Sequence, residues 1–162
     1  MAIATETTSI DPMQADIVGI SLTLAVNEAC YAPLIHRGSG DGLFADGIVD
    51  GQIKPSEALA ILKPLLEDEG VLKIGENLKF DALVLAQHGI TLAAIDDIIL
   101  LSYVLDAGRA SHSIDALSEA WLGHATIARN EVVGSGKNQL SFDRVPIERA
   151  TEYAAERADV TL

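Results

Sequence analysis

The first third of the chain alternates apolar and polar positions with the two-residue period of β-strands. Residues 2–7 form one such segment, residues 16–25 a second that is rich in β-branched side chains, and residues 29–35 a third. Alternation of this kind between short polar breaks is typical of strands that each bury one face. The pattern predicts three antiparallel strands at the start of the fold.

Beyond residue 54 the apolar positions recur at the spacing of α-helices. Residues 36–54 contain many glycines and predict a surface loop. Pro55 suits the first turn of a helix, which is expected to run to Gly70. A short strand is predicted at 71–75, and further helices at 77–88, 97–105, 113–122 and from 146 to the end. Trp121 lies at helical spacing from Leu117 and is expected in the core.

Length and composition favour one folded α/β domain, residues 1–162. Hydrophobic residues make up 49% and charged residues 22% of the chain. No apolar run reaches the roughly 18 to 20 residues of a membrane helix, so no membrane partner and a cytoplasmic location are expected. The single cysteine, Cys30, is expected to be a semi-buried hydrophobe. A strand that starts at the first residues suggests a domain excised from a longer polypeptide.

The charge balance is strongly acidic. Eleven Lys plus Arg residues against 24 Asp plus Glu give a net charge of −13. Such a surface repels a polyphosphate chain, so weak non-specific nucleic-acid binding is expected. A carboxylate cluster can nevertheless hold divalent cations that meet a phosphate directly.

Three segments each place a pair of residues on one face. Ala4 and Glu6 are two apart in a strand, whereas Asn77 with Asp81, and Tyr153 with Arg157, are four apart in helices. Taken singly, each carboxylate is most simply a solvated surface charge.

Three short motifs, taken in order, resemble a known family: T-E-T at 5–7, G-E-N-L-K-F-D at 75–81 and Y-A-A-E-R-A-D-V-T-L at 153–162. Four longer segments carry the same resemblance, at 62–90, 96–124, 134–142 and 151–162. The chain is similar to the 3′–5′ proofreading exonuclease domains of bacterial DNA polymerase I (family A), in the tyrosine subclass of the DEDD exonuclease superfamily. The resemblance implies an α/β, ribonuclease-H-like mixed sheet, with three antiparallel strands followed by parallel ones, flanked by helices.

The same resemblance implies hydrolysis of the 3′-terminal phosphodiester of a single-stranded DNA end, with a polymerase domain in the same chain. Two Mg²⁺ or Mn²⁺ ions would activate the water and neutralise charge on the leaving oxygen. Matched to the family, Glu6 and Asp81 are catalytic residues and metal ligands, and Tyr153 is the catalytic tyrosine that orients the water. Ala4 and Arg157 stand where the family has two further metal-binding aspartates.

These two replacements predict that metal binding and hydrolysis are lost or severely impaired. Glu156 and Asp159 lie elsewhere on the last helix, so neither is expected to substitute for the lost ligand, and Asp11 is predicted to be a turn residue. Arg157 is expected to pair with Glu6 or Asp81 and stand in for a metal. The alternative function is a non-catalytic structural module that supports the polymerase domain.

The family also suggests residues near the DNA end: Ile10, Asn77, His112, Ile114 and Arg129, the last in place of a phenylalanine that packs on a base. Simpler interpretations stay open for three of them. Asn77 would be a helix N-cap, Ile10 part of the core and His112 a solvated loop residue.

Overall fold

The computed structural model describes residues 1–38 and 47–162, so the middle of the predicted loop at 36–54 lies outside the described residues. Five strands form one sheet in the order β3-β2-β1-β4-β5. β1 pairs antiparallel with β2 and parallel with β4, and β4 pairs parallel with β5. The predicted mixed sheet is therefore confirmed. The strands are β1 (Ala2–Thr7), β2 (Ile17–Thr23), β3 (Ala29–Pro33), β4 (Lys73–Gly75) and β5 (Ile95–Asp97).

The helices follow the predicted order. They are α1 (Pro55–Leu66), α2 (Leu78–Gln87), α3 (Ile98–Leu105), α4 (Ile114–Leu122), α5 (Arg129–Val133) and α6 (Ile147–Thr161). The sequence did not predict β5, α5 or the two short 3₁₀ helices at Gly136–Asn138 and Phe142–Arg144. These elements have only three to five residues, too few for a period to show.

Helix α1 ends four residues before the predicted Gly70. The Asp68 side chain accepts a hydrogen bond from the Gly70 backbone N–H at 2.8 Å, which favours a turn over a further helical turn. Lys73, fully buried at the start of β4, donates from Nζ to the Asp68 carbonyl at 2.7 Å. A lysine charge thus neutralises backbone carbonyls at the end of α1, where the helix dipole is negative.

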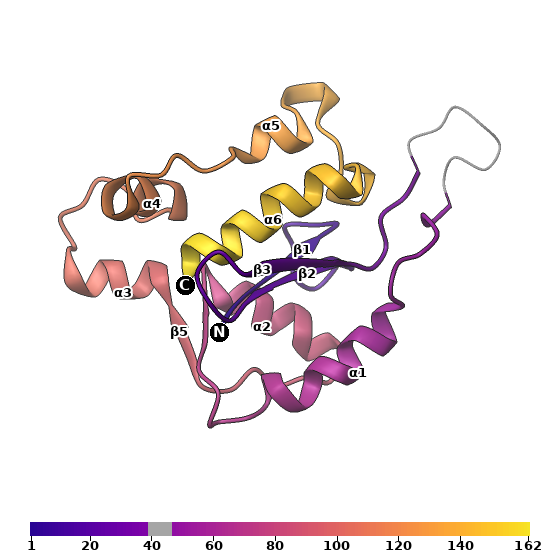
Figure 1. Ribbon diagram of the computed structural model, residues 1–162, viewed down its shortest axis with the longest axis horizontal. Helices are drawn as coiled ribbons and strands as arrows, with labels where there is room; N and C mark the ends of the chain where they lie inside the picture. Colours follow the sequence, from indigo (N-terminus) through magenta and orange to yellow (C-terminus); the bar gives the residue numbers. More distant parts are fainter. Residues whose placement is uncertain (39–46) are drawn as a thin grey trace.

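Helices cover both faces of the sheet, with α6 crossing one face and α1 and α2 lying on the other (Figure 1). Ile3 and Ile17 belong to the core cluster that contains residues of α1 and α2, whereas Val18 belongs to the cluster with α5 and α6. Because strand side chains alternate, the neighbours of Ile3 point the other way, and Ala4 and Glu6 face α6. The two predicted members of the first motif therefore lie beneath the last helix.

Two predictions of burial were wrong. Trp121 is 72% exposed, and the helix that carries it, α4, lies at the edge of the molecule (Figure 1). Cys30 is exposed, since β3 is an edge strand and its alternate residue Tyr31 takes the inward position. Across the described ranges, the helices are all too short or too polar to cross a membrane.

Candidate active site

A cleft of about 840 Å³ opens where β1, the start of α2 and helix α6 meet. Its lining unites nearly every site residue that the sequence predicted: Ala4, Glu6, Ile10, Asn77, Asp81, Ile114, Arg129, Tyr153 and Arg157. These residues span the whole length of the chain. The topology therefore brings the three sequence pairs to one place, as the resemblance implied.

Glu6 is the remaining acid of the first strand and is 6% exposed. Its Oε2 accepts a hydrogen bond from Nη1 of Arg129 at 3.0 Å, which makes a charge-assisted ion pair. Burial raises the pKa of Glu6 above its usual value, while the guanidinium of Arg129 and, more weakly, that of Arg157 oppose the rise. The cation that faces this carboxylate is thus supplied by the protein itself.

Asp81 comes from α2 and is 4% exposed. Its Oδ1 accepts hydrogen bonds from both the backbone N–H of Thr5, at 2.8 Å, and the hydroxyl of Thr5, at 2.7 Å. Burial raises the pKa of Asp81 to about 6, against the opposing effect of the Thr5 hydrogen bonds, and the nearby Glu6 carboxylate adds to the rise. Thr5 therefore anchors this carboxylate on β1.

Arg157 does not pair with Glu6 or Asp81, and that prediction was wrong. It makes ion pairs with Glu76, through Nη2, and with Asp115, through Nη1 at 3.1 Å. Glu76 precedes α2 and Asp115 opens α4, so the long side chain reaches outward along the cleft to both. The arginine that was expected at Glu6 comes instead from α5, where Arg129 is placed.

The third motif keeps its tyrosine. Tyr153 on α6 is 2% exposed, and the guanidinium carbon of Arg157 lies 5.5 Å from the centre of its ring. Burial raises the pKa of Tyr153, although Arg157 and Arg129 both act against the rise. The phenol is therefore protonated at neutral pH and can orient a polar group in the cleft.

The other carboxylates on the last helix point away, as expected. Glu156 accepts hydrogen bonds from His124 Nε2 at 2.8 Å and from the Ile127 N–H at 2.6 Å, and Asp159 accepts one from the Asn27 N–H at 2.6 Å. Asp11 accepts from the Met13 N–H at 3.0 Å in a turn, as predicted.

Four of the residues expected near a DNA end line the cleft: Ile10, Asn77, Ile114 and Arg129. Ile10 is 96% exposed at the cleft mouth, so it is not part of the core. Asn77 precedes α2 with φ of 58°, a left-handed conformation that asparagine tolerates, and its side chain makes no capping hydrogen bond to the helix. Ile114 is buried and Arg129 half-exposed, both in the cleft lining.

His112 lies outside this cleft lining. It is 7% exposed, its Nδ1 lies 2.7 Å from the Ser102 hydroxyl, and its ring stacks on Tyr103 at 3.7 Å between centres. It is thus neither a solvated loop residue nor a neighbour of the acids, because the segment after α3 folds back onto that helix.

The residues present do not fit a pair of divalent cations. Within residues 1–38 and 47–162, no three Asp, Glu, His or Cys side chains gather in a ligand cluster. Glu6 is engaged by Arg129, and Asp81 is held on one oxygen by Thr5. A guanidinium beside a carboxylate repels a divalent cation and competes for the same oxygen. Sequence reasoning missed Thr5 and Asp115 as partners of Asp81 and Arg157, and it matched Glu76 to a position near the DNA end, not to a partner of Arg157.

Comparisons with known proteins show the family of the chain. A family model described as "3′–5′ exonuclease" matches residues 1–162. DNA polymerase I of Rhizobium leguminosarum is 50% identical over 171 residues, and that of Pseudomonas aeruginosa is 44% identical over 165 residues. Each match covers 100% of this chain and 17% of the relative, so the chain spans about a sixth of the length of these relatives.

Solved structures share the fold at lower identity. Brucella melitensis NrnC with bound Mg²⁺ gives a TM-score of 0.69 at 19% identity, over 99% of this chain and 66% of that one. A Pol1 structure from M. smegmatis, described as its POL domain with DNA primer-template and dNTP, gives 0.65 at 19% identity, over 98% of this chain and 21% of that one. With the full-length family match and the 50% identical relative, these findings lead to one conclusion: the chain belongs to the 3′–5′ exonuclease family of DNA polymerase I.

Proposed function

We propose that this chain is a proofreading-exonuclease domain of a DNA polymerase I that has lost metal-dependent hydrolysis and serves that polymerase as a non-catalytic module. The observation that carries the proposal is the ion pair between Arg129 and Glu6. The guanidinium of Arg129, with a charge of +1, pairs with the Glu6 carboxylate that, by family resemblance, would ligate a metal.

Two further differences support the loss. Ala4 has no ligand atom on its side chain, and Arg157 carries a positive charge where the family has an acid. In a two-metal site, removal of one ligand already costs orders of magnitude in rate, because both cations must be held for in-line displacement. Here two acids are absent and a third is engaged by Arg129.

The residue roles follow from the same resemblance. Glu6 and Asp81 would ligate metal and Tyr153 would orient the attacking water in an intact site. In this chain Glu6 and Asp81 instead act as anchors for Arg129 and Thr5, which link β1 to α5 and to α2. Retention of a folded cleft without hydrolysis fits a domain that is kept for its place in a larger enzyme.

The test is digestion of a 3′-labelled single strand, together with calorimetric titration of Mn²⁺. We expect the unmodified chain to bind no Mn²⁺ in the cleft and to leave the strand intact. The triple variant Ala4→Asp, Arg157→Asp, Arg129→Phe should bind Mn²⁺ and shorten the strand from its 3′ end, by at least about 100-fold faster than the unmodified chain.

A matched control adds Glu6→Gln to the triple variant, which should abolish both metal binding and digestion. If the unmodified chain digests the strand and Glu6→Gln abolishes that digestion, the proposal is overturned, because Glu6 would then be a working ligand despite Arg129.

A further inference from the structure

The cleft between β1, α2 and α6 carries more acid than base. Of the described residues, four carboxylates and two guanidiniums line it: Glu6, Glu76, Asp81, Asp115, Arg129 and Arg157. Four negative and two positive charges leave a net charge of −2 when all six groups are ionised. The rest of the molecule adds to this, because the whole chain has a net charge of −13. A polyphosphate strand that approaches the cleft is therefore repelled.

Both guanidiniums already bind carboxylates of the protein. Arg157 donates from Nη2 to Glu76 and from Nη1 to Asp115, at 3.1 Å, and its side chain is only 16% exposed. Arg129 donates to Glu6 at 3.0 Å. A phosphate group could bind Arg157 only by displacing two carboxylates, and those carboxylates would then remain in the cleft beside it.

Glu76 and Asp115 are each held in place by a second partner. Oε1 of Glu76 accepts a hydrogen bond from the Ile114 N–H at 3.2 Å, and Oδ1 of Asp115 accepts one from the Thr126 hydroxyl at 2.6 Å. The first acid precedes α2 and the second lies in the first turn of α4. The two acids thus hold Arg157, which comes from α6, between three elements of the fold.

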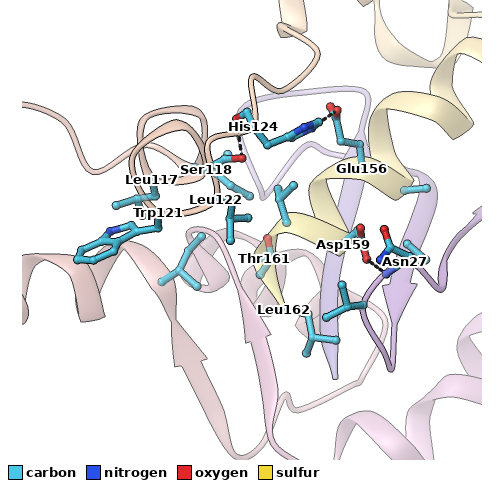
Figure 2. Close-up of a pocket in the computed structure, with 16 residues that line it drawn as sticks. Asn27, Leu117, Ser118, Trp121, Leu122, His124, Glu156, Asp159, Thr161 and Leu162 are labelled. Atoms are coloured by element: carbon cyan, nitrogen blue, oxygen red, sulfur yellow. Dashed lines mark hydrogen bonds and ion pairs between the residues drawn. The ribbon is translucent and has the colours of Figure 1, made fainter.

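The remaining acids near the end of α6 belong to another groove, of about 820 Å³, between α4 and that helix end. Figure 2 shows Glu156 paired with His124, and Asp159 beside Asn27, whose backbone N–H it binds. Neither acid lines the cleft. Within the cleft, Glu76 and Asp115 therefore supply half of the carboxylates that a strand would meet.

We infer that Glu76 and Asp115 exclude nucleic acid from the cleft by engaging Arg157. The inference rests on the proposed loss of hydrolysis and extends it, because the cleft then fails to hold a single strand as well as to cut it. The two acids determine specificity, since they keep a guanidinium of the cleft from phosphate ligands. Removal of their charge with little change of shape should open the cleft to a strand.

Fluorescence anisotropy of a 5′-labelled single strand of DNA tests the inference in EDTA, which removes the divalent cations that hydrolysis needs. At pH 8 and about 50 mM salt, we expect the unmodified chain to bind the strand only weakly. Glu76→Gln combined with Asp115→Asn should lower the Kd at least about 10-fold, because the cleft then has no net charge and Arg157 can meet a phosphate.

The new amides keep an oxygen for Ile114 and Thr126, so the fold should be retained. Each single substitution, Glu76→Gln or Asp115→Asn, should lower the Kd about 3-fold, which keeps the test available if the double variant does not fold. An unchanged Kd in the folded variants would overturn the inference.

Two further variants separate the cleft from the total charge. Glu57→Gln combined with Glu152→Gln removes two charges from exposed ion pairs, with Lys54 and Arg149, that lie outside the cleft lining. This pair of changes should alter the Kd by under about 2-fold. Arg157→Gln added to the cleft double variant should cancel its gain, because the phosphate ligand is then lost.

Equal tightening by the exposed pair of changes would overturn the inference, because total charge would then set the affinity. Tight binding by the unmodified chain that Arg129→Met weakens would also overturn it, because the cleft would then already hold a strand. Neither result bears on the proposed loss of hydrolysis, which digestion in the presence of Mn²⁺ tests separately.

Discussion

Arg129 and Glu6 are 123 positions apart in the sequence, and Nη1 of the arginine lies 3.0 Å from Oε2 of the glutamate. The glutamate is buried on β1, while the arginine is half-exposed at the start of α5. The guanidinium carbon also lies 5.4 Å from the centre of the Phe142 ring. A short helix that the sequence did not predict is thereby fastened to the central strand of the sheet.

Arg129→Met should lower the free energy of unfolding by about 2 kcal/mol at pH 8, because the buried Glu6 carboxylate loses its partner. The loss should shrink as the pH falls, since burial raises the pKa of Glu6 and protonation then removes the stranded charge. Urea unfolding at pH 8 and pH 5 measures both effects. Arg149→Met, which breaks the exposed 3.0 Å pair with Glu152, is the control and should cost under about 0.5 kcal/mol. Equal losses in the two variants would refute the prediction.

Asp81→Asn should make the domain more stable at pH 8. The pKa of Asp81 is raised from 3.8 to about 6, so the unfolded chain releases this proton at lower pH than the folded one does. The charged Asp81 carboxylate therefore lowers the free energy of unfolding, increasingly between about pH 4 and pH 6 and by its full amount above pH 6. Asparagine keeps an oxygen for Thr5 and removes the charge. We expect a gain of up to about 3 kcal/mol at pH 8 and none at pH 3.5.

Thermal unfolding of Asp81→Asn from pH 3.5 to pH 8 measures whether the gain in stability grows as the pH rises, and Asp11→Asn is the exposed control. A gain that is the same at both ends of the range would show that the carboxylate charge is not the cause.

Arg157→Ala should loosen α4 more than it destabilises the core. The arginine joins Glu76, before α2, to Asp115 in the first turn of α4, and Glu76 Oε1 also accepts from the Ile114 N–H at 3.2 Å. Without the guanidinium, two carboxylates face each other unbridged. We expect amides of 114–122 to exchange about 10-fold faster, with β1 and β2 unchanged. Arg157→Lys should not restore protection, because one ammonium lacks the fork that reaches both acids.

Gly19→Ala should destabilise the fold by more than about 2 kcal/mol. A Cβ built on Gly19 would lie 2.1 Å from the Tyr31 hydroxyl oxygen and 2.2 Å from Cζ of that ring. The ring cannot easily withdraw, because its hydroxyl lies 2.7 Å from Nε2 of the fully buried His36, whose Nδ1 lies 2.9 Å from the Val145 carbonyl oxygen. Gly70→Ala, where the nearest atom is a side-chain oxygen at 3.2 Å, should change stability by under about 1 kcal/mol. Unfolding of both variants in guanidinium chloride measures the two changes in stability.

The sheet and the long helices could be predicted because their periods are carried by many residues. β1, for example, has the predicted bounds Ala2–Thr7. The ends of elements depended on local side-chain bonds that no period shows, such as that from Gly70 to Asp68. The exposure of Trp121 could not be predicted either, because helical spacing identifies a face and not what lies opposite it.

For the cleft, sequence motifs correctly brought together Glu6, Asp81 and Tyr153. They failed for the arginines, because a flexible side chain of that length can reach several acids and only the three-dimensional arrangement decides among them. Arg157 was therefore assigned to the wrong partners, and Arg129 was viewed as a lost aromatic contact instead of as the cation at Glu6.

The Arg129–Glu6 pair also bears on how the sequence can change from here. Restoring an aspartate at position 4 alone adds negative charge beside acids that are already buried, and restoring one at 157 alone removes the bridge to Glu76 and Asp115. Neither step by itself completes a metal site, and Arg129 continues to hold Glu6 after both. The effects of changes at positions 4, 129 and 157 are therefore coupled, and a change at one of them alone is expected to lower stability.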